Sequence, residues 1–396
     1  MAVEREAVRA RLHALGFDEV RFARVESGFG PALSDWVEAG YHADMNWMER
    51  SVAKRSDPSL VLPGARSVIM LGVNYLPPLK ARTDNASAAS NDGSKWVGNA
   101  GISSNERPAW ARYALYDDYH DSIKAALVLA GKVLEELGAV TASDYRYYVD
   151  TGPIIERGWA AKSGLGFIGK NGMLISRQHG NWLFLAAVLT TQEFEPDAPV
   201  RKEAVGREVE PGLLCGKCTR CMDACPTQAL PKPGVVDARR CVSYQTIENK
   251  GIIPRELREG IGHRIYGCDT CLEVCPWNRF AKEGRQVLLA ARYGLADIPL
   301  SEVLALTPEH FAAVFKGTAI KRVKLRGLLR NACIVAANTG AMECLDVLVG
   351  LAGHASPVVR AHAVWAVRKM GAGERLNEIQ AAEGDELVLA EYLGAV

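Results

Sequence analysis

The spacing of the cysteines restricts the fold of this chain more than any other feature. The first run is C-x2-C-x2-C-x3-C followed by proline, and it contains Cys215, Cys218, Cys221 and Cys225. The second run, C-x2-C-x3-C followed by proline, repeats this pattern without its first cysteine and contains Cys268, Cys271 and Cys275. Such runs hold cubane iron–sulfur clusters, and in proteins with two clusters the last cysteine of a run binds the other cluster. The spacing therefore predicts two 4Fe-4S clusters.

Crossed ligation assigns every cysteine of this segment, with Cys241 supplying the ligand that the second run lacks. The predicted ligands of the first cluster are Cys215, Cys218, Cys221 and Cys275. Those of the second cluster are Cys225, Cys241, Cys268 and Cys271. Two structural zinc ions are the alternative, because paired C-x2-C groups also form tetrahedral thiolate sites, but zinc requires neither the C-x3-C-P ending nor its repetition. Cys333 and Cys344 lie outside these runs, and we expect both to be small core residues.

Length and charge limit the class of protein. The chain has 396 residues with 47 Lys and Arg against 46 Asp and Glu, so its formal charge of +1 gives no general affinity for nucleic acids or membranes. No segment has the eighteen or more consecutive apolar residues of a membrane helix, and the first 17 residues read as a charged amphipathic helix rather than a signal sequence. We expect a cytoplasmic protein that does not bind membranes, with reduced cysteines.

The pattern of elements predicts three parts. Residues 1–204 read as an α/β domain, with strands near 67–73, 145–149 and 182–189 and a helix over 117–137 that ends at Gly138. Residues 205–290 carry the cysteines and form a ferredoxin-like two-cluster domain. Residues 291–396 are all-helical, and the stretch 356–368 resembles the second helix of a HEAT repeat. Residues 80–108 lack periodicity, which predicts a long loop.

Two other segments are candidate sites. Asp150 follows a predicted strand and precedes a helix, a position typical of both catalytic carboxylates and ordinary N-caps. The string G-x-G-x-x-G at 164–169 follows a helix rather than a strand, which argues against a dinucleotide site; its glycines allow either close packing against a flat cofactor or a simple turn.

A basic stretch over 316–330 contains six basic side chains and no acidic one. They are Lys316, Lys321, Arg322, Lys324, Arg326 and Arg330. A basic helical face without aromatic rings suits phosphate contacts to structured RNA or DNA. A solvated helix face is the alternative of equal weight.

Several strings taken together resemble the epoxyqueuosine reductase family. They are Leu62 to Ser67, Asp118-Tyr119-His120, Asp150 to Pro153 with Glu156-Arg157, Gly164 to Asn171, Cys241 to Tyr244, and Gly267 to Cys271 with Cys275-Pro276-Trp277-Asn278. The last block is absent from simple ferredoxins. The resemblance extends from about Leu62 to the C-terminus.

The resemblance implies an α/β cobalamin-binding domain, a ferredoxin-like domain with two 4Fe-4S clusters and a HEAT-like C-terminal domain. It further implies reduction of epoxyqueuosine to queuosine at the wobble position of tRNA, the last step of queuosine biosynthesis, in which an external low-potential donor supplies electrons through the clusters to cobalamin. Asp150 matches the family's proton donor. The positions that match cobalamin contacts are Tyr113, Asp150, Ser243, Cys268 and Asp269. Lys250 and the basic stretch match tRNA contacts. We expect a monomer.

Two alternatives remain open from the sequence. A cobalamin-dependent reductase of the reductive dehalogenase type also combines cobalamin with two clusters, but its small substrate leaves the basic stretch unexplained. A two-cluster electron carrier fused to a helical scaffold would contain iron and sulfide without a corrinoid.

Overall fold

The computed structural model describes residues 4–25, 32–77, 108–138, 140–200 and 210–394. They form two compact units built from alternating chain segments. Unit 1 contains Met1–Ala81, Asp118–Asp237 and Thr270–Ala290, and unit 2 contains Arg82–Asp117, Ala238–Asp269 and Ala291–Val396. The bounds of these units differ from the three consecutive segments expected from the sequence, because residues 205–290 are divided between both units. The predicted loop over 80–108 lies, except for Pro108, outside the described residues.

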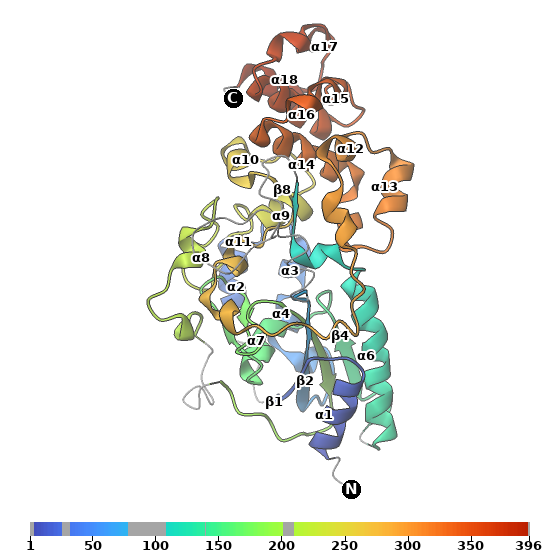
Figure 1. The fold of residues 1–396 in the computed structure, drawn as a ribbon. Coiled ribbons are helices and arrows are strands. Elements are labelled where there is room, and N and C mark those ends of the chain that lie inside the picture. The colour runs from blue at the N-terminus through green and yellow to red at the C-terminus, as the bar shows by residue number, and fades with distance from the viewer. Residues whose placement is uncertain (1–3, 26–31, 78–107, 139, 201–209, 395–396) are drawn as a thin grey trace. The chain divides into compact units, whose positions relative to one another are not determined.

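The body of unit 1 is a four-stranded antiparallel sheet of order β1-β2-β7-β4 (Figure 1). Its strands are β1 (Glu19–Arg24), β2 (Ser67–Asn74), β7 (Leu183–Thr190) and β4 (Tyr145–Tyr148). Every residue of β2 is buried, so both faces of the sheet must be covered. Helix α7 (Glu156–Lys162) packs on the sheet, and its Trp159 belongs to the same buried core cluster as Val68 and Met70. Helices α1 (Arg5–Ala14) and α6 (Tyr119–Glu136) also contact the sheet. Strands β2, β4 and β7 and helix α6 confirm the elements expected from the sequence, whereas the edge strand β1 was not among them.

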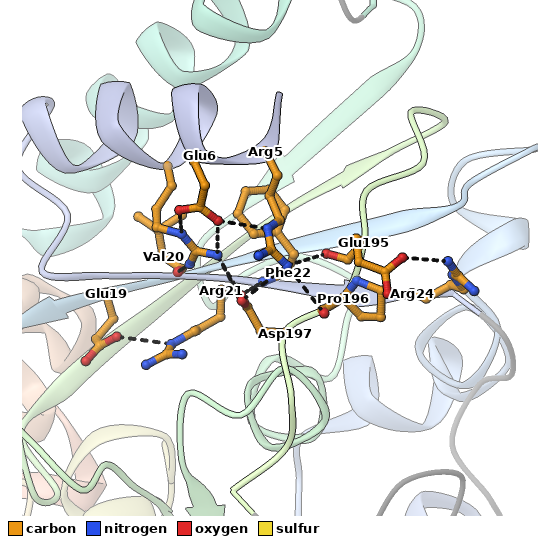
Figure 2. Close-up of polar contacts among 11 residues, drawn as sticks. Arg5, Glu6, Glu19, Val20, Arg21, Phe22, Arg24, Glu195, Pro196 and Asp197 are labelled. Atoms are coloured by element: carbon orange, nitrogen blue, oxygen red, sulfur yellow. Dashed lines mark hydrogen bonds and ion pairs between the residues drawn. The ribbon is translucent and has the colours of Figure 1, made fainter. Parts of the chain in front are cut away.

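The edge strand β1 is covered by the segment that follows β7. Asp197 accepts hydrogen bonds from the Phe22 backbone N–H and the Arg9 guanidinium, both at 2.9 Å, and its own N–H donates to the Phe22 carbonyl (Figure 2). Arg5 donates to the Glu195 carbonyl at 2.9 Å. These contacts satisfy strand-edge groups that would otherwise be open to pairing.

Unit 1 also contains shorter elements outside this sheet, some of which carry the cysteines. They are α2 (Ala32–Glu38), α3 (Asn46–Arg50), α4 (Val52–Ser56), η1 (Pro58–Leu60), β5 (Phe167–Ile168), β6 (Leu174–Ile175), η4 (Leu213–Cys215), α8 (Arg220–Asp223), α11 (Thr270–Glu273) and η5 (Pro276–Phe280).

Unit 2 combines a two-stranded parallel ribbon with an array of helices. The ribbon consists of β3 (Ala109–Trp110) and β8 (Arg264–Tyr266). The other elements are η2 (Arg112–Leu115), α9 (Val242–Ile247), α10 (Arg255–Ile261), η6 (Tyr293–Asp297), α12 (Leu300–Leu304), α13 (Pro308–Val314), η7 (Ala319–Val323), α14 (Lys324–Thr339), η8 (Met342–Cys344), α15 (Leu345–Leu351), α16 (Pro357–Lys369), η9 (Gly373–Leu376), α17 (Asn377–Ala381) and α18 (Glu386–Leu393).

The core of the helical array lies between α14, α15, α16 and α18, drawn from orange to red in Figure 1. Cys333 and Cys344 are fully buried in this core, which confirms the structural role expected for them. The absence of strands after Gly294 in the described part of the chain also matches the expectation. Among the described residues, no helix is both long and apolar enough to span a membrane.

Candidate functional site

Four cysteine thiols of unit 1 gather around one position. Cys215 ends η4, Cys221 lies in α8, and Cys275 directly precedes η5. Burial, together with the neighbouring Cys215, Cys275 and Cys218 thiols, raises the pKa of the Cys221 thiol to about 11. Four neighbouring thiols are a donor set for an iron–sulfur core once they are deprotonated, and they are the four residues predicted for the first cluster.

Backbone N–H groups point at the sulfur atoms of this segment. The Ala229 N–H donates to Cys225 Sγ at 3.2 Å, and the backbone N–H groups of Met222 and Trp277 donate to Cys221 and Cys275. Such donors stabilise thiolates, so the segment fits an anionic cluster. Among the described residues, no group of three or more His, Cys, Asp or Glu side chains is arranged around a single metal ion.

Asp150 lies in a tight turn of unit 1 that favours an exposed carboxyl. Its φ of 58° is in the left-handed region, and the Thr151 N–H donates to the Val149 carbonyl at 2.6 Å across it, which is a strained three-residue turn. The turn packs on Tyr148, because a Cβ at Gly152 would lie 2.2 Å from Tyr148 Cδ1. The N-cap of α7 is Ile155, so Asp150 does not have the capping role that was the alternative from sequence.

The start of α6 supplies the partners of Asp150. The Tyr119 hydroxyl donates to Asp150 Oδ2 at 2.8 Å, and His120 Nε2 lies 3.3 Å from the same oxygen. His120 Nδ1 lies 2.8 Å from Asp118 Oδ1. Burial alone would lower the pKa of His120, but the hydrogen bonds to Asp118 and Asp150 outweigh it and raise the pKa to about 9. At neutral pH the imidazolium therefore holds a proton beside the Asp150 carboxyl.

Sequence reasoning missed this role of Tyr119 and His120. They stand about thirty residues before Asp150, and only the sheet topology brings the start of α6 beside the end of β4. Their adjacency to Asp118, the residue that caps α6 through the His120 N–H, was the available signal.

The glycines of the 164–169 string are explained by contacts within unit 1. A Cβ at Gly164 would lie 2.1 Å from the Ala198 carbonyl oxygen, and one at Gly166 would lie 2.4 Å from that of Ile175. The structure therefore favours the chain-packing alternative over a cofactor contact at these glycines.

Three of the predicted cofactor contacts of unit 2 surround the end of its ribbon. Tyr113 lies in η2, and the preceding Arg112 N–H donates to Asp269 Oδ2 at 2.7 Å. Gly267, with φ of 69°, carries the chain from β8 to Cys268 and Asp269, and its N–H donates to Thr246 Oγ1 at 2.9 Å. Thr246 lies in helix α9, about one turn after the half-buried Ser243 of the same helix. Cys241 directly precedes this helix.

A second surface of unit 2 is basic. Lys250 Nζ donates to the Ile247 and Arg322 carbonyls at 2.7 and 3.2 Å, and Arg326 Nη2 donates to the Lys250 carbonyl at 3.2 Å. Burial lowers the pKa of Lys250; Glu248 opposes this shift, and Arg322 and Lys324 add to it. We define the basic surface as Lys250, Lys321, Arg322, Lys324 and Arg326, all exposed.

Arg330 does not belong to the basic surface, so its assignment as a tRNA contact was wrong. Its side chain is fully buried and donates to the carbonyls of Gln245, Asn249 and Gly251 at 2.7, 2.7 and 3.0 Å. The basic stretch does not form one helical face. It is divided between η7, which ends at Val323, and α14, which starts at Lys324 with φ of 60°, and Arg330 lies on the buried side of α14.

Comparisons with known proteins give the family. The model "4Fe-4S double cluster binding domain" matches residues 214–278, and the model "Epoxyqueuosine reductase QueG, DUF1730" matches residues 55–151. The epoxyqueuosine reductase of Vibrio cholerae is 37% identical over 358 residues, covering 90% of this chain and 89% of that protein. The chain belongs to the epoxyqueuosine reductase family. It is an oxidoreductase. The match to the double-cluster model supports two iron–sulfur clusters rather than the two structural zinc ions that the sequence left as the alternative.

Other members of the family support the same assignment. The Escherichia coli epoxyqueuosine reductase is 35% identical, covering 89% of this chain and 86% of its own. A crystal structure of epoxyqueuosine reductase with an epoxyqueuosine-modified stem loop of tRNA-Tyr has a TM-score of 0.79 and 28% identity, covering 98% of this chain and 96% of that one. The enzyme from Streptococcus thermophilus has a TM-score of 0.77 and the same identity, covering 97% of this chain and 96% of that one.

Proposed function

We propose that this chain reduces the epoxide of epoxyqueuosine to the alkene of queuosine at the wobble position of tRNA. The observation that carries the proposal is the Asp150 carboxyl, held by Tyr119 and His120 in a chain that belongs to this family and contains a double-cluster segment. Removing the epoxide oxygen as water consumes two electrons and two protons, so the chain must hold redox groups and a proton source.

The cysteines hold the redox groups. The first cluster is bound by Cys215, Cys218, Cys221 and Cys275, which the interactions among their thiols support. The second is bound by Cys225, Cys241, Cys268 and Cys271, as the crossed spacing predicts. When bound, the clusters supply one-electron transfer from an external low-potential donor, and cobalamin supplies the two-electron chemistry at the epoxide.

Residues of unit 2 fit part of a corrin's requirements. The amide side chains of a corrin need hydroxyl and carboxylate partners, and the half-buried Tyr113, Ser243 and Asp269 offer them around the end of the ribbon, with Cys268 beside Asp269. Gly267 adds a close backbone approach, since a Cβ there would lie 2.5 Å from that of Ala111. We assign cobalamin binding to these residues of unit 2.

Asp150 delivers a proton to the departing oxygen, and His120 then supplies a new proton to Asp150. Tyr119 and the imidazolium orient the carboxyl by donating to Oδ2, and Asp118 stabilises the imidazolium from the other side of the ring. A proton that leaves Asp150 can return from His120 Nε2, which is the geometry required of an acid pair.

The basic surface contacts the tRNA backbone. Its five cations are exposed without a stacking aromatic residue among them, which suits phosphates of a folded stem loop rather than unstacked bases. Lys250 is positioned by its own hydrogen bonds to Ile247 and Arg322, so its charge is presented at a fixed point.

The test is anaerobic reconstitution with iron, sulfide and cobalamin, followed by incubation with tRNA that carries epoxyqueuosine and mass spectrometry of the nucleosides. The proposal predicts about eight irons and one cobalt per chain, together with conversion to queuosine. Eight irons without retained cobalt would instead indicate an electron carrier. Retained cobalt with turnover of an aryl halide but not of tRNA would indicate a dehalogenase.

A further inference from the structure

The first cysteine run is exposed, whereas the second is not. Five residues between Cys215 and Cys225 are exposed, namely Gly216, Lys217, Thr219, Arg220 and Asp223. From Gly267 to Asn278, by contrast, every residue is buried or half-buried. Cys268, a proposed ligand of the second cluster, is also one of the proposed cobalamin contacts. The first cluster is therefore the one that an external electron donor can reach.

The chain around the first run is basic, although the whole sequence is nearly neutral. Three segments, 157–192, 211–222 and 274–282, together contain eight Lys and Arg and no Asp or Glu. Asp223, the first acidic residue after the middle segment, accepts a hydrogen bond from Thr219 Oγ1 at 2.6 Å. In a chain with 47 basic and 46 acidic side chains, such an asymmetry creates a local positive field that attracts anionic partners.

Strand β5 connects the three basic segments within unit 1. The Gly212 N–H, at the start of η4, donates to the Ile168 carbonyl of β5 at 2.7 Å. The neighbouring Phe167 packs its ring on Trp277, with the centroids 5.1 Å apart. One short strand therefore contacts both the start of the first run and the residues that follow Cys275.

Two further contacts hold these segments around the proposed ligands of the first cluster. Lys170 Nζ donates to the Gly216 carbonyl at 2.7 Å, next to Cys215. Helix α8, which carries Cys221, packs against α11, which ends just before Cys275. The basic segments therefore border the same four cysteines.

Two apolar side chains lie exposed beside these cysteines. Leu213 is 44% exposed and Phe280 is 48% exposed. The Phe280 ring lies 5.8 Å from the Trp277 ring, and the Arg279 guanidinium lies 4.5 Å from the centre of the Phe280 ring. We define the first-run surface as the exposed residues Leu213, Lys217, Arg220, Arg279 and Phe280. Exposed aromatic side chains together with arginines are typical of interfaces with proteins.

We propose that the first-run surface docks a small acidic protein that carries one electron at a time and reduces the first cluster. The cations of this surface complement the acidic carrier, and its apolar side chains favour a protein over RNA, because phosphates require only cations. Each transfer oxidises the carrier by one electron and reduces the cluster by one electron, and no bond forms or breaks. Two transfers supply the electrons that removal of the epoxide oxygen consumes. The inference rests on the proposed function, which requires an external donor.

The test is stopped-flow reduction of the anaerobic reconstituted protein by a pre-reduced acidic 2Fe-2S ferredoxin. The variant Lys217→Glu/Arg220→Glu reverses two charges of the first-run surface. Its matched control, Lys124→Glu/Lys132→Glu, makes the same change in net charge at two exposed positions of α6. Photoreduced deazaflavin, a small uncharged reductant, reports on the cluster without a docking step.

The first-run variant should accept electrons from ferredoxin at least about tenfold more slowly than the parent at low ionic strength. The parent rate should fall as salt is added, whereas the rate of this variant should depend little on salt. The control variant should match the parent, and all three proteins should react equally with deazaflavin. Equal ferredoxin rates in both variants would overturn the inference. A tRNA affinity that falls in the first-run variant would also overturn it, because the surface would then be an RNA contact.

Cross-linking of the unsubstituted protein keeps the inference testable if the first-run variant loses iron. A carbodiimide joins carboxylates of bound ferredoxin directly to lysines, and we expect the cross-linked peptide to contain Lys217. Cross-links confined to the basic surface of unit 2 would overturn the inference. Queuosine formation with deazaflavin tests the proposed function separately. A parent that forms none, yet shows the expected ferredoxin rates, would contradict the activity and leave the docking site in place.

Discussion

Replacing Arg330 with methionine should destabilise unit 2 far more than the same change at Arg326. Arg330 and Asn331 close the C-terminal end of α9, where Arg330 bonds the Gln245 carbonyl and Asn331 bonds the Thr246 carbonyl at 2.8 Å. Arg330 also bonds the carbonyls on either side of Lys250, those of Asn249 and Gly251. Its removal leaves two buried carbonyls and one partly buried carbonyl without this donor, each at a cost of about 1–3 kcal/mol.

The net cost is smaller than that sum. Burial lowers the pKa of Arg330 to about 9, which shows that the guanidinium is itself costly to bury, and methionine removes that penalty. We therefore expect a loss of roughly 3–5 kcal/mol, typical of breaking a buried charged network. Arg326 is exposed, so Arg326→Met should change stability by less than about 0.5 kcal/mol.

The assay is urea unfolding of the anaerobic protein with its clusters retained, followed by tryptophan fluorescence, beside tRNA binding by each variant. Arg326→Met should keep its unfolding midpoint and bind tRNA more weakly. Arg330→Met should unfold at much lower urea. An Arg330 variant within about 1 kcal/mol of the parent would refute the structural role and return Arg330 to the RNA-binding residues.

Three further predictions follow from the site. The pKa of His120 is raised from 6.5 to about 9 in the folded protein, so its pairing with Asp118 and Asp150 stabilises the fold fully below pH 6.5, and that stability is lost as the pH rises through 9. Single-turnover rates should fall over the same alkaline range. The variant His120→Gln should lose the pH dependence of both the stability and the rate. An alkaline limb that persists in His120→Gln would contradict this. Lys324→Ala and Arg326→Ala should each reduce the slope of log affinity for tRNA against log salt concentration by about 1, as measured by fluorescence anisotropy. An unchanged slope would show that the residue does not contact a phosphate. Gly152→Ala should displace the turn that holds Asp150, because the added Cβ would clash with Tyr148. Turnover should drop at least about tenfold with the iron content unchanged. Normal turnover would show that the turn is not held by this contact.

The sequence predicted best where chemistry fixes spacing. Cys215, Cys218 and Cys221 lie at the short intervals of a cluster-binding run, and the C-x3-C-P ending of the second run indicated Cys275 as their fourth neighbour, so the gathering of these thiols could be predicted. The strands and α6 followed from apolar periodicity, and Cys333 from its apolar surroundings.

Tertiary context decided the rest. The direction of Arg330 depends on a helix that starts at Lys324 with a positive φ, which composition alone does not reveal. His120 reaches Asp150 only because the start of α6 lies beside the end of β4.

The most direct test of the account is the activity of Asp150→Asn on tRNA that carries epoxyqueuosine. The amide keeps the shape of the carboxyl but cannot donate a carboxylic proton. The account predicts that this variant retains the iron and cobalt of the parent and binds tRNA equally well, yet forms no queuosine in a single turnover with pre-reduced protein. Queuosine formed at the parent rate would contradict the assignment of Asp150 as the proton donor.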